Sequence, residues 1–148
     1  MGLVLADTLA GAILPEPYAA ELAALNAAND GLSQAQRVLG PRVLSEDPER
    51  TFLYLQIAGF NSVTRKTLKG QMPRYAVADL ARLATPILFV VGEDDVLCPP
   101  RFMKAAHELV PGSRFEVIRG AGHSAYFEDP KAFNALVLGF LDAIVATR

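Results

Sequence analysis

The last third of the sequence alternates between two kinds of apolar run, and this alternation sets the strongest limit on the fold. TPILFVVG, residues 85–92, is continuously apolar behind a proline and predicts a strand. PPRFMKAAHELV, residues 99–110, opens with prolines and predicts a helix, and SRFEVIRG, residues 113–120, predicts a second strand. DPKAFNALVLGFLDAIVA, residues 129–146, predicts a long amphipathic helix with Asp129 as its cap. This order is typical of parallel α/β units, so an α/β fold is expected.

A further strand is expected at the start of the chain. GLVLAD, Gly2–Asp7, is a short apolar run ended by a polar turn, as in strands that are buried on both faces of a parallel sheet. No earlier strand in the sequence could cover its second edge. We therefore expect this strand to lie at an exposed edge or to pair with another chain, and we expect self-association in solution.

From about residue 15 to residue 79 the pattern favours short helices. PYAAELAALNAAND, residues 17–30, has alanines and leucines at helical spacing, and a glycine follows as a stop. Another helix is expected to begin at Pro48, with Asp47 as its cap. NSVTRKTLKG, residues 61–70, predicts a further short helix. We expect no strand in this block.

Composition limits the classes of function. The chain has 148 residues, 51% of them apolar, and a net charge of −2, which predicts a packed domain without the basic surface that nucleic-acid binding requires. The first residues lack the positive start of a signal peptide, and no apolar stretch approaches the ~18 residues of a membrane span. One cysteine and two histidines allow no internal disulfide and predict no metal site. We therefore expect a cytoplasmic protein with no metal and no cofactor, and with neither nucleic acid nor membrane as a partner.

Two loops carry residues suited to catalysis. GEDDVLCPP, residues 92–100, leaves one predicted strand, and RGAGHSAYF, residues 119–127, leaves the next. Because ligands of open parallel sheets bind at the carboxyl ends of strands, these loops are expected at one edge. An acid there could hold one nitrogen of His123 while the other nitrogen takes a proton from a nucleophile. Taken separately, His123 could be an ordinary loop histidine, and Asp94 and Asp95 simple turn residues. Their order and placement favour the catalytic interpretation.

Residues 83–143 resemble the C-terminal end of an α/β-hydrolase-fold enzyme, and GLVLADT resembles the strand before the helical lid of that family. In the family the acid stands three residues after the glycine that ends its strand, which is Asp95 here. The family's histidine follows a Gly-x-Gly turn, which is GAGH and therefore His123. The resemblance implies hydrolysis of an ester, lactone or similar bond, with Asp95 orienting His123 as general base of a Ser-Asp-His triad. The chain is broadly similar to lactonases, esterases and cofactor-free haloperoxidase-like members.

The family's nucleophile stands in a Gly-x-Ser-x-Gly turn ahead of the segment that is matched here. GLSQA at Ser33 spells this turn only in part, and a helix rather than a strand is predicted before it. Ser124 adjoins His123, which makes a productive hydrogen bond to the ring awkward. Cys98 is better interpreted as a small buried filler. The nucleophile and the oxyanion donors are therefore expected to come from elsewhere.

Three further interpretations concern single residues or small groups. Asp7, at the end of the first strand, is a weaker alternative to Asp95 as the acid. His107 is expected to be a solvent-facing side chain on its helix. A cluster of basic residues in the helical block favours a solvated face over a site that attracts a substrate carboxylate. Its members are Arg65, Lys66, Lys69 and Arg74.

The predicted fold is a partial α/β-hydrolase fold, with the last three parallel strands, flanking helices and an inserted helical lid. It forms a single region, 1–148, with the lid at about residues 12–80 and the sheet and core helices at 1–11 and 81–148. We expect the chain to be inactive alone. Three interpretations stay open: a truncated hydrolase, a subunit of a split hydrolase whose N-terminal-half partner chain supplies the serine, and a non-catalytic binding or assembly module.

Overall fold

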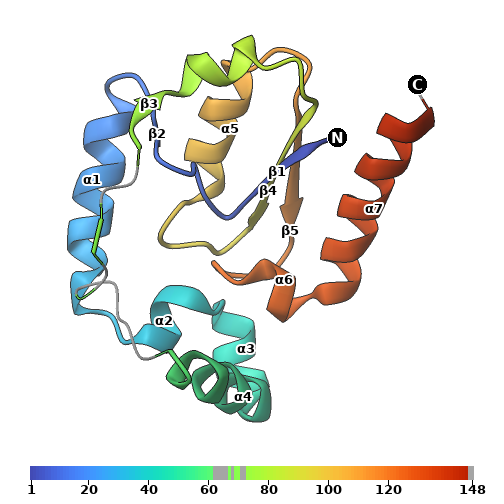
Figure 1. Ribbon diagram of the computed structural model, residues 1–148. Coiled ribbons are helices and arrows are strands. Elements are labelled where there is room, and N and C mark those ends of the chain that lie inside the picture. Colours follow the sequence, from blue (N-terminus) through green and yellow to red (C-terminus); the bar gives the residue numbers. More distant parts are fainter. Residues whose placement is uncertain (62–66, 68, 71–72, 147–148) are drawn as a thin grey trace.

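A three-stranded parallel sheet organises the computed structural model, which describes residues 1–61, 67, 69–70 and 73–146. The strands β1 (Leu3–Ala6), β4 (Ile87–Gly92) and β5 (Arg114–Ile118) lie in the order β1-β4-β5. Leu3 is paired with Ile87, and Leu88 with Arg114, so β4 has a strand on each side. All three strands were predicted from the sequence, and β1 lies at an edge of this sheet as expected (Figure 1).

Helices cover the two faces of the sheet. Helix α5 (Pro100–Glu108) lies on one side of the strands and α7 (Pro130–Ala146) on the other, with the short α6 (Ala125–Glu128) ahead of α7 (Figure 1). Asp129 caps α7, since its Oδ1 accepts the amide of Ala132 at 2.9 Å. Both long helices and this cap were predicted from the sequence.

The inserted block is a series of short helices, as predicted. It contains α1 (Tyr18–Ala28), which continues into η1 (Asn29–Gly31), and then α2 (Gln34–Val38), α3 (Pro41–Glu46) and α4 (Pro48–Gly59). Asp47 caps α4 through the amide of Arg50 at 2.9 Å. In Figure 1, α2, α3 and α4 gather near α6, below the carboxyl ends of the strands. Much of the helix expected over residues 61–70 lies outside the described residues, and so do Arg65 and Lys66 of the basic cluster.

The expectation of no strand between residues 15 and 79 was wrong. Strand β3 (Tyr75–Ala76) pairs in parallel with β2 (Ala12–Ile13), and η2 (Val77–Arg82) follows it. A ladder of two residues is too short to show any periodicity in sequence. It forms because the two ends of the inserted block come together, with Tyr75 Oη also donating to the carbonyl of Ala10 at 3.2 Å.

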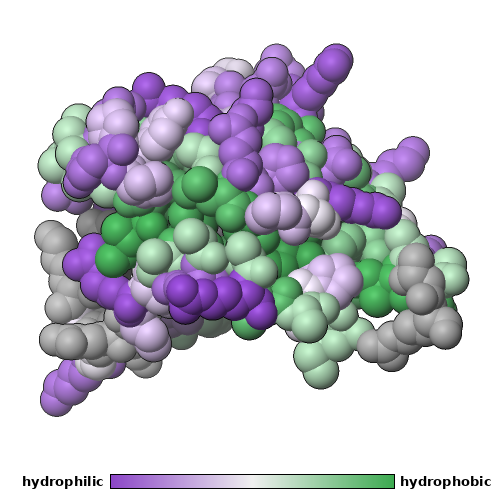
Figure 2. All heavy atoms as spheres, turned by 90° about the horizontal axis from the view of Figure 1, so that it is seen from above, coloured by the Kyte–Doolittle hydropathy of each residue, from purple (hydrophilic) through white to green (hydrophobic). Residues whose placement is uncertain are grey.

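Apolar side chains also reach the surface. Figure 2, seen from above, shows apolar surface among polar side chains at the end of the molecule where the strands begin. On α4 and α7 several large apolar residues are exposed, which is typical of surfaces that meet another molecule. They are Phe52, Leu53 and Ile57 on α4, with Phe60 directly after it, and Leu138, Leu141 and Val145 on α7.

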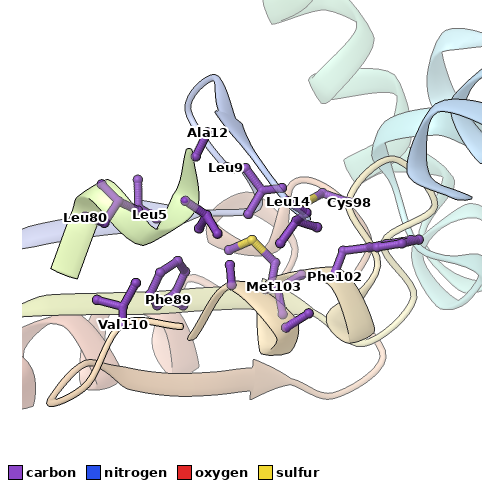
Figure 3. Packing of buried hydrophobic residues seen from close by; sticks show 14 of the residues in the cluster. Leu5, Leu9, Ala12, Leu14, Leu80, Phe89, Cys98, Phe102, Met103 and Val110 are labelled. Carbon is purple, nitrogen blue, oxygen red and sulfur yellow. The ribbon is translucent and has the colours of Figure 1, made fainter. Parts of the chain in front are cut away.

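The core has one cluster on each face of β4, whose residues are all buried. On one face Phe89 belongs to the same cluster as Phe102 and Met103 of α5 (Figure 3). Leu88 packs in the cluster of the other face, with Phe140 of α7. Full burial of each such side chain stabilises the fold by about 1.5–3 kcal/mol. The two clusters fix β4, and hence the loop that follows it.

Gly92, where β4 ends, tests how tightly this edge is packed. A Cβ at this position would lie against the carbonyl oxygens of Gly122 and Ala121, well inside the 3.0 Å that real Cβ contacts keep. We predict that Gly92→Ala lowers the free energy of unfolding by about 3 kcal/mol, because the obstacle is backbone that cannot rotate away. Urea denaturation measures the effect.

Gly59→Ala is the matched control, because a Cβ added there would have no atom within 4 Å and the residue ends a helix. It should be neutral, or stabilising by up to about 1 kcal/mol. Equal effects of the two substitutions would contradict the packing described here.

Candidate active site

Two loops meet where β4 and β5 end, and main-chain hydrogen bonds hold them together. We call residues 93–99 the acid loop and residues 119–124 the histidine loop. The amide of Glu93 donates to the carbonyl of Ile118 at 2.9 Å, and that of Asp94 to Ala121 at 2.8 Å. The Glu93 side chain accepts the amide of Gly120 at 2.9 Å. The two loops are therefore one packed unit, as their placement at neighbouring strand ends predicted.

The acid and the histidine are in direct contact. His123 Nδ1 lies 3.0 Å from Asp95 Oδ2, as predicted for this pair. The other oxygen, Oδ1, accepts the amides of Leu97 at 2.8 Å and Cys98 at 2.9 Å. The Asp95 side chain is fully buried, whereas 30% of the His123 side chain is exposed. This geometry fixes the Nδ1–H tautomer and leaves Nε2 as the nitrogen that can take a proton.

Two opposing effects set the pKa of His123. Burial lowers it, because the charged imidazolium loses hydration. The hydrogen bond to Asp95, together with the negative charges of Asp95 and Asp7, outweighs burial and raises the pKa above its ordinary value. The pair is therefore arranged to stabilise an imidazolium, which a general base becomes during reaction.

We predict that Asp95→Asn lowers the pKa of His123 to its ordinary value or below, because burial stays while the charge is lost. An NMR titration of the histidine ring protons measures this shift. The chain has only two histidines, so His107 provides a reference in the same sample. If the His123 titration in Asp95→Asn is the same as in the unaltered chain, and the His107 signal shows that the variant is folded, the pairing of His123 with Asp95 is contradicted.

Asp7 lies beside this pair without taking its place. Its backbone has a φ of 54°, in the left-handed region, and its side chain is 3% exposed. Its Oδ1 accepts the amide of Gly92 at 2.8 Å. Burial raises the pKa of Asp7 to about 7; the Gly92 hydrogen bond opposes this, and the charge of Asp95 adds to it. Asp95, and not Asp7, makes the hydrogen bond to His123, as the preferred assignment expected.

The raised pKa of Asp7 gives stability a definite dependence on pH. The folded chain binds a proton at pH values where the unfolded chain has lost it, so the free energy of unfolding falls as pH rises from about 4 to about 7. Asp7→Asn keeps an oxygen that can accept the Gly92 amide and should remove a fall of about 3 kcal/mol between pH 5 and pH 8, since the folded chain holds this proton from pH 5 to about pH 7. Urea denaturation at pH 5 and pH 8 measures it. If Asp7→Asn and the unaltered chain show the same pH dependence, the raised pKa of Asp7 is contradicted. Any fall in the free energy of unfolding that remains in Asp7→Asn is expected from His123.

The other nucleophile candidates serve structural roles. Ser33 caps α2, with its Oγ accepting the amide of Gln36 at 3.3 Å. Buried Ser124 donates its hydroxyl to Tyr54 Oη at 3.0 Å. Cys98 belongs to the apolar core, and burial raises the pKa of its thiol to about 12, which disfavours the thiolate. None of the three has the placement of an activated nucleophile.

The expectation for His107 was wrong. Its side chain is half-buried, with Nδ1 at 2.7 Å from Ser113 Oγ and its ring stacked on Phe115 at 5.8 Å between centroids. Phe89 lies 6.3 Å from the ring on another side. The helical position alone suggested exposure, but the tight turn to β5 brings Ser113 and Phe115 over it.

Glu128 is a buried residue that the sequence interpretation missed. It accepts two main-chain amides, from Gly40 and Gly122. Its only signal in the sequence is an acid at the end of SAYFE, ahead of the helix cap, where a solvated turn residue is the usual case.

A large hollow of the surface lies away from the pair. It has a volume of about 1000 Å³ and is formed by residues 9–14, α1, Pro73 and Arg74, and none of its lining residues belongs to either loop. Within the described residues, no group of three or more His, Cys, Asp or Glu side chains is placed to hold a metal ion. In the same part of the chain, no helix is long and apolar enough to cross a membrane.

Comparison with known proteins matches this fold. Residues 2–136 match the model of the alpha/beta hydrolase family. The chain belongs to the alpha/beta hydrolase family. Over 103 residues it is 32% identical to the uncharacterised protein Rv2715 of Mycobacterium tuberculosis, covering 68% of this chain and 29% of that protein. The chain thus spans less than a third of this curated relative.

Two solved structures of hydrolases superpose on nearly the whole chain. A thermophilic esterase from Thermogutta terrifontis is 25% identical with a TM-score of 0.71, covering 97% of this chain and 56% of the esterase. Carboxylesterase CesB from Bacillus subtilis is 26% identical with a TM-score of 0.61, covering 93% of this chain and 50% of that enzyme. This alpha/beta hydrolase chain therefore corresponds to about half of each structure.

Proposed function

We propose that this chain supplies the acid and the base of a hydrolase that cleaves an ester, lactone or similar bond. The observation that carries the proposal is the 3.0 Å contact between His123 Nδ1 and buried Asp95. Membership of the alpha/beta hydrolase family and the two esterases among the structural neighbours support the choice of bond.

The reaction follows from the orientation of the imidazole. His123 Nε2 takes the proton of a nucleophilic hydroxyl as its oxygen bonds to the carbonyl carbon, and Asp95 stabilises the imidazolium. The imidazolium then gives this proton to the leaving alkoxide oxygen as the ester C–O bond breaks. Water repeats the sequence on the acyl intermediate and releases the acid. The hydroxyl and the oxyanion donors come from polypeptide outside these 148 residues.

We propose that this polypeptide docks along β1. Among the described strands β1 pairs only with β4, so its other edge offers main-chain donors and acceptors to a further strand. The exposed apolar residues of α4 and α7 offer additional surface for such a partner. In its absence the same edge favours self-association of this chain.

We predict that the 148-residue chain alone releases nitrophenolate from p-nitrophenyl acetate no faster than its His123→Ala variant. Adding a chain with the Gly-x-Ser-x-Gly half of the fold should produce turnover that His123→Ala and Asp95→Asn reduce by at least about 100-fold, as loss of a general base does. Steady-state kinetics and a serine-reactive probe make the measurement.

The outcome against the proposal is equally specific. Multiple turnovers by the lone chain, lost in His123→Ala and accompanied by probe labelling of one of its own serines, would place the nucleophile inside these residues. His107→Ala is unsuitable as a control, because its ring packs against Phe89 and Phe115. Glu116→Gln, an exposed change on β5, serves instead.

A further inference from the structure

Glu128 joins two parts of the chain that are far apart in sequence. It is the last residue of α6 and only 2% exposed. Its Oε1 accepts the amide of Gly122 at 2.7 Å, and its Oε2 accepts the amide of Gly40 at 2.7 Å. Gly122 directly precedes His123, whereas Gly40 belongs to the inserted helical block. One carboxylate thus binds the histidine loop and the lid at the same time.

Both amides need an acceptor from outside their own element. Gly40 is the cap residue of α3, so its N–H lies outside the helix, and no side chain caps that helix. Gly122 lies in the turn after β5, beyond the strand ladder. Burial raises the pKa of Glu128, and the hydrogen bonds from the two amides oppose this because they stabilise the ionised carboxylate.

The two glycines allow the backbones to touch. A Cβ on Gly122 would lie 2.5 Å from the nitrogen of Gly40, and a Cβ on Gly40 would lie 2.9 Å from the nitrogen of Gly122. No side chain therefore separates the lid from the histidine loop at this point. A displacement of either backbone is transmitted directly to the other.

Helix α4 of the lid adds two contacts to the same region. Arg50 Nη1 donates to the main-chain carbonyl of Glu128 at 2.6 Å, while its Nε pairs with Asp47 at 3.0 Å. Tyr54 Oη accepts the hydroxyl of Ser124, which follows His123, at 3.0 Å. The lid therefore contacts the residues on both sides of His123.

We propose that Glu128 is a positioning residue that fastens the lid to the histidine loop, so that the place of the lid sets the place of the His123 ring against Asp95. The catalytic meaning of this link rests on the proposed role of His123 as base. The link itself is measured by NMR and needs no activity assay, so its failure is distinct from a failure of that role.

The first experiment follows the His123 ring in the 148-residue chain by NMR titration. Glu128→Gln leaves one acceptor oxygen and turns an NH2 group toward the second amide. We expect the pKa of His123 to fall by about half a unit or more as its ring loses its fixed place against Asp95. Glu116→Gln, which removes an equal charge from the exposed face of β5, should leave the pKa unchanged.

The second experiment changes the lid without changing any charge. Gly40→Ala places a methyl group against the Gly122 amide and 3.1 Å from Glu128 Oε2, so we expect the His123 resonances and titration to move. Gly31→Ala, also in the helical block, meets no atom within 4 Å and should have no effect on His123. A change in the His123 resonances and titration in Gly40→Ala, but not in Gly31→Ala, would show that the lid affects the ring through its position and without any loss of charge.

The half-buried His107 reports whether each variant is folded, since its ring lies against Phe89 and Phe115. A native His107 signal with an unchanged His123 titration in both Glu128→Gln and Gly40→Ala would overturn the proposal. If both variants unfold, amide exchange in the unaltered chain decides. Exchange at Gly40 at least about tenfold slower than for an unprotected amide supports the link, and unprotected exchange overturns it.

Discussion

The contact between His123 and Asp95 depends on the close approach of two backbones where β4 and β5 end. Gly92 and Gly122 lie so close that a Cβ on Gly92 would meet the carbonyl of Gly122. Main-chain bonds from Glu93 and Asp94 then fix the acid loop against the histidine loop. The two apolar clusters around β4 hold this strand from both faces. The core thus sets the position of the loops, and the loops set the 3.0 Å contact.

Three buried carboxylates surround the histidine loop, and their partners separate their roles. Asp95 accepts two amides and the N–H of the imidazole, and it is the carboxylate that contacts His123. Glu128 accepts two amides and lies behind the loop. Asp7 accepts the amide of Gly92, and burial outweighs its hydrogen bonds and raises its pKa to about 7. Burial also raises the pKa of Glu128, and its amide partners oppose this. Sequence alone shows three acids near strand or helix ends, whereas the structure shows that only Asp95 contacts the imidazole and only Glu128 binds the amides of two separate segments.

The sheet, the long helices and the Asp95–His123 pair could be predicted because their signals are local. An apolar strand, a proline-started helix and a loop after each strand are visible in short windows, and parallel topology brings the loops together. The β2–β3 ladder and the environment of His107 could not be predicted in this way. Two-residue pairing and the stacking of Phe115 over His107 arise from contacts between elements, which leave no period in the sequence. Glu128 belongs to the same class, because its second partner, Gly40, lies 88 residues away.

The hydrogen bonding that orients Asp95 and His123 comes entirely from residues of this chain. Among the described residues, every buried side-chain nitrogen and oxygen has a hydrogen-bond partner. The contact with Asp95 sets the tautomer of His123, and both oxygens of Asp95 already have hydrogen-bond partners. A polypeptide that adds strands beside β1 would meet a base that is already oriented, so its binding energy need not be spent on ordering the acid loop. Under the proposed function, such a partner supplies a hydroxyl within reach of Nε2 and donors for the oxyanion.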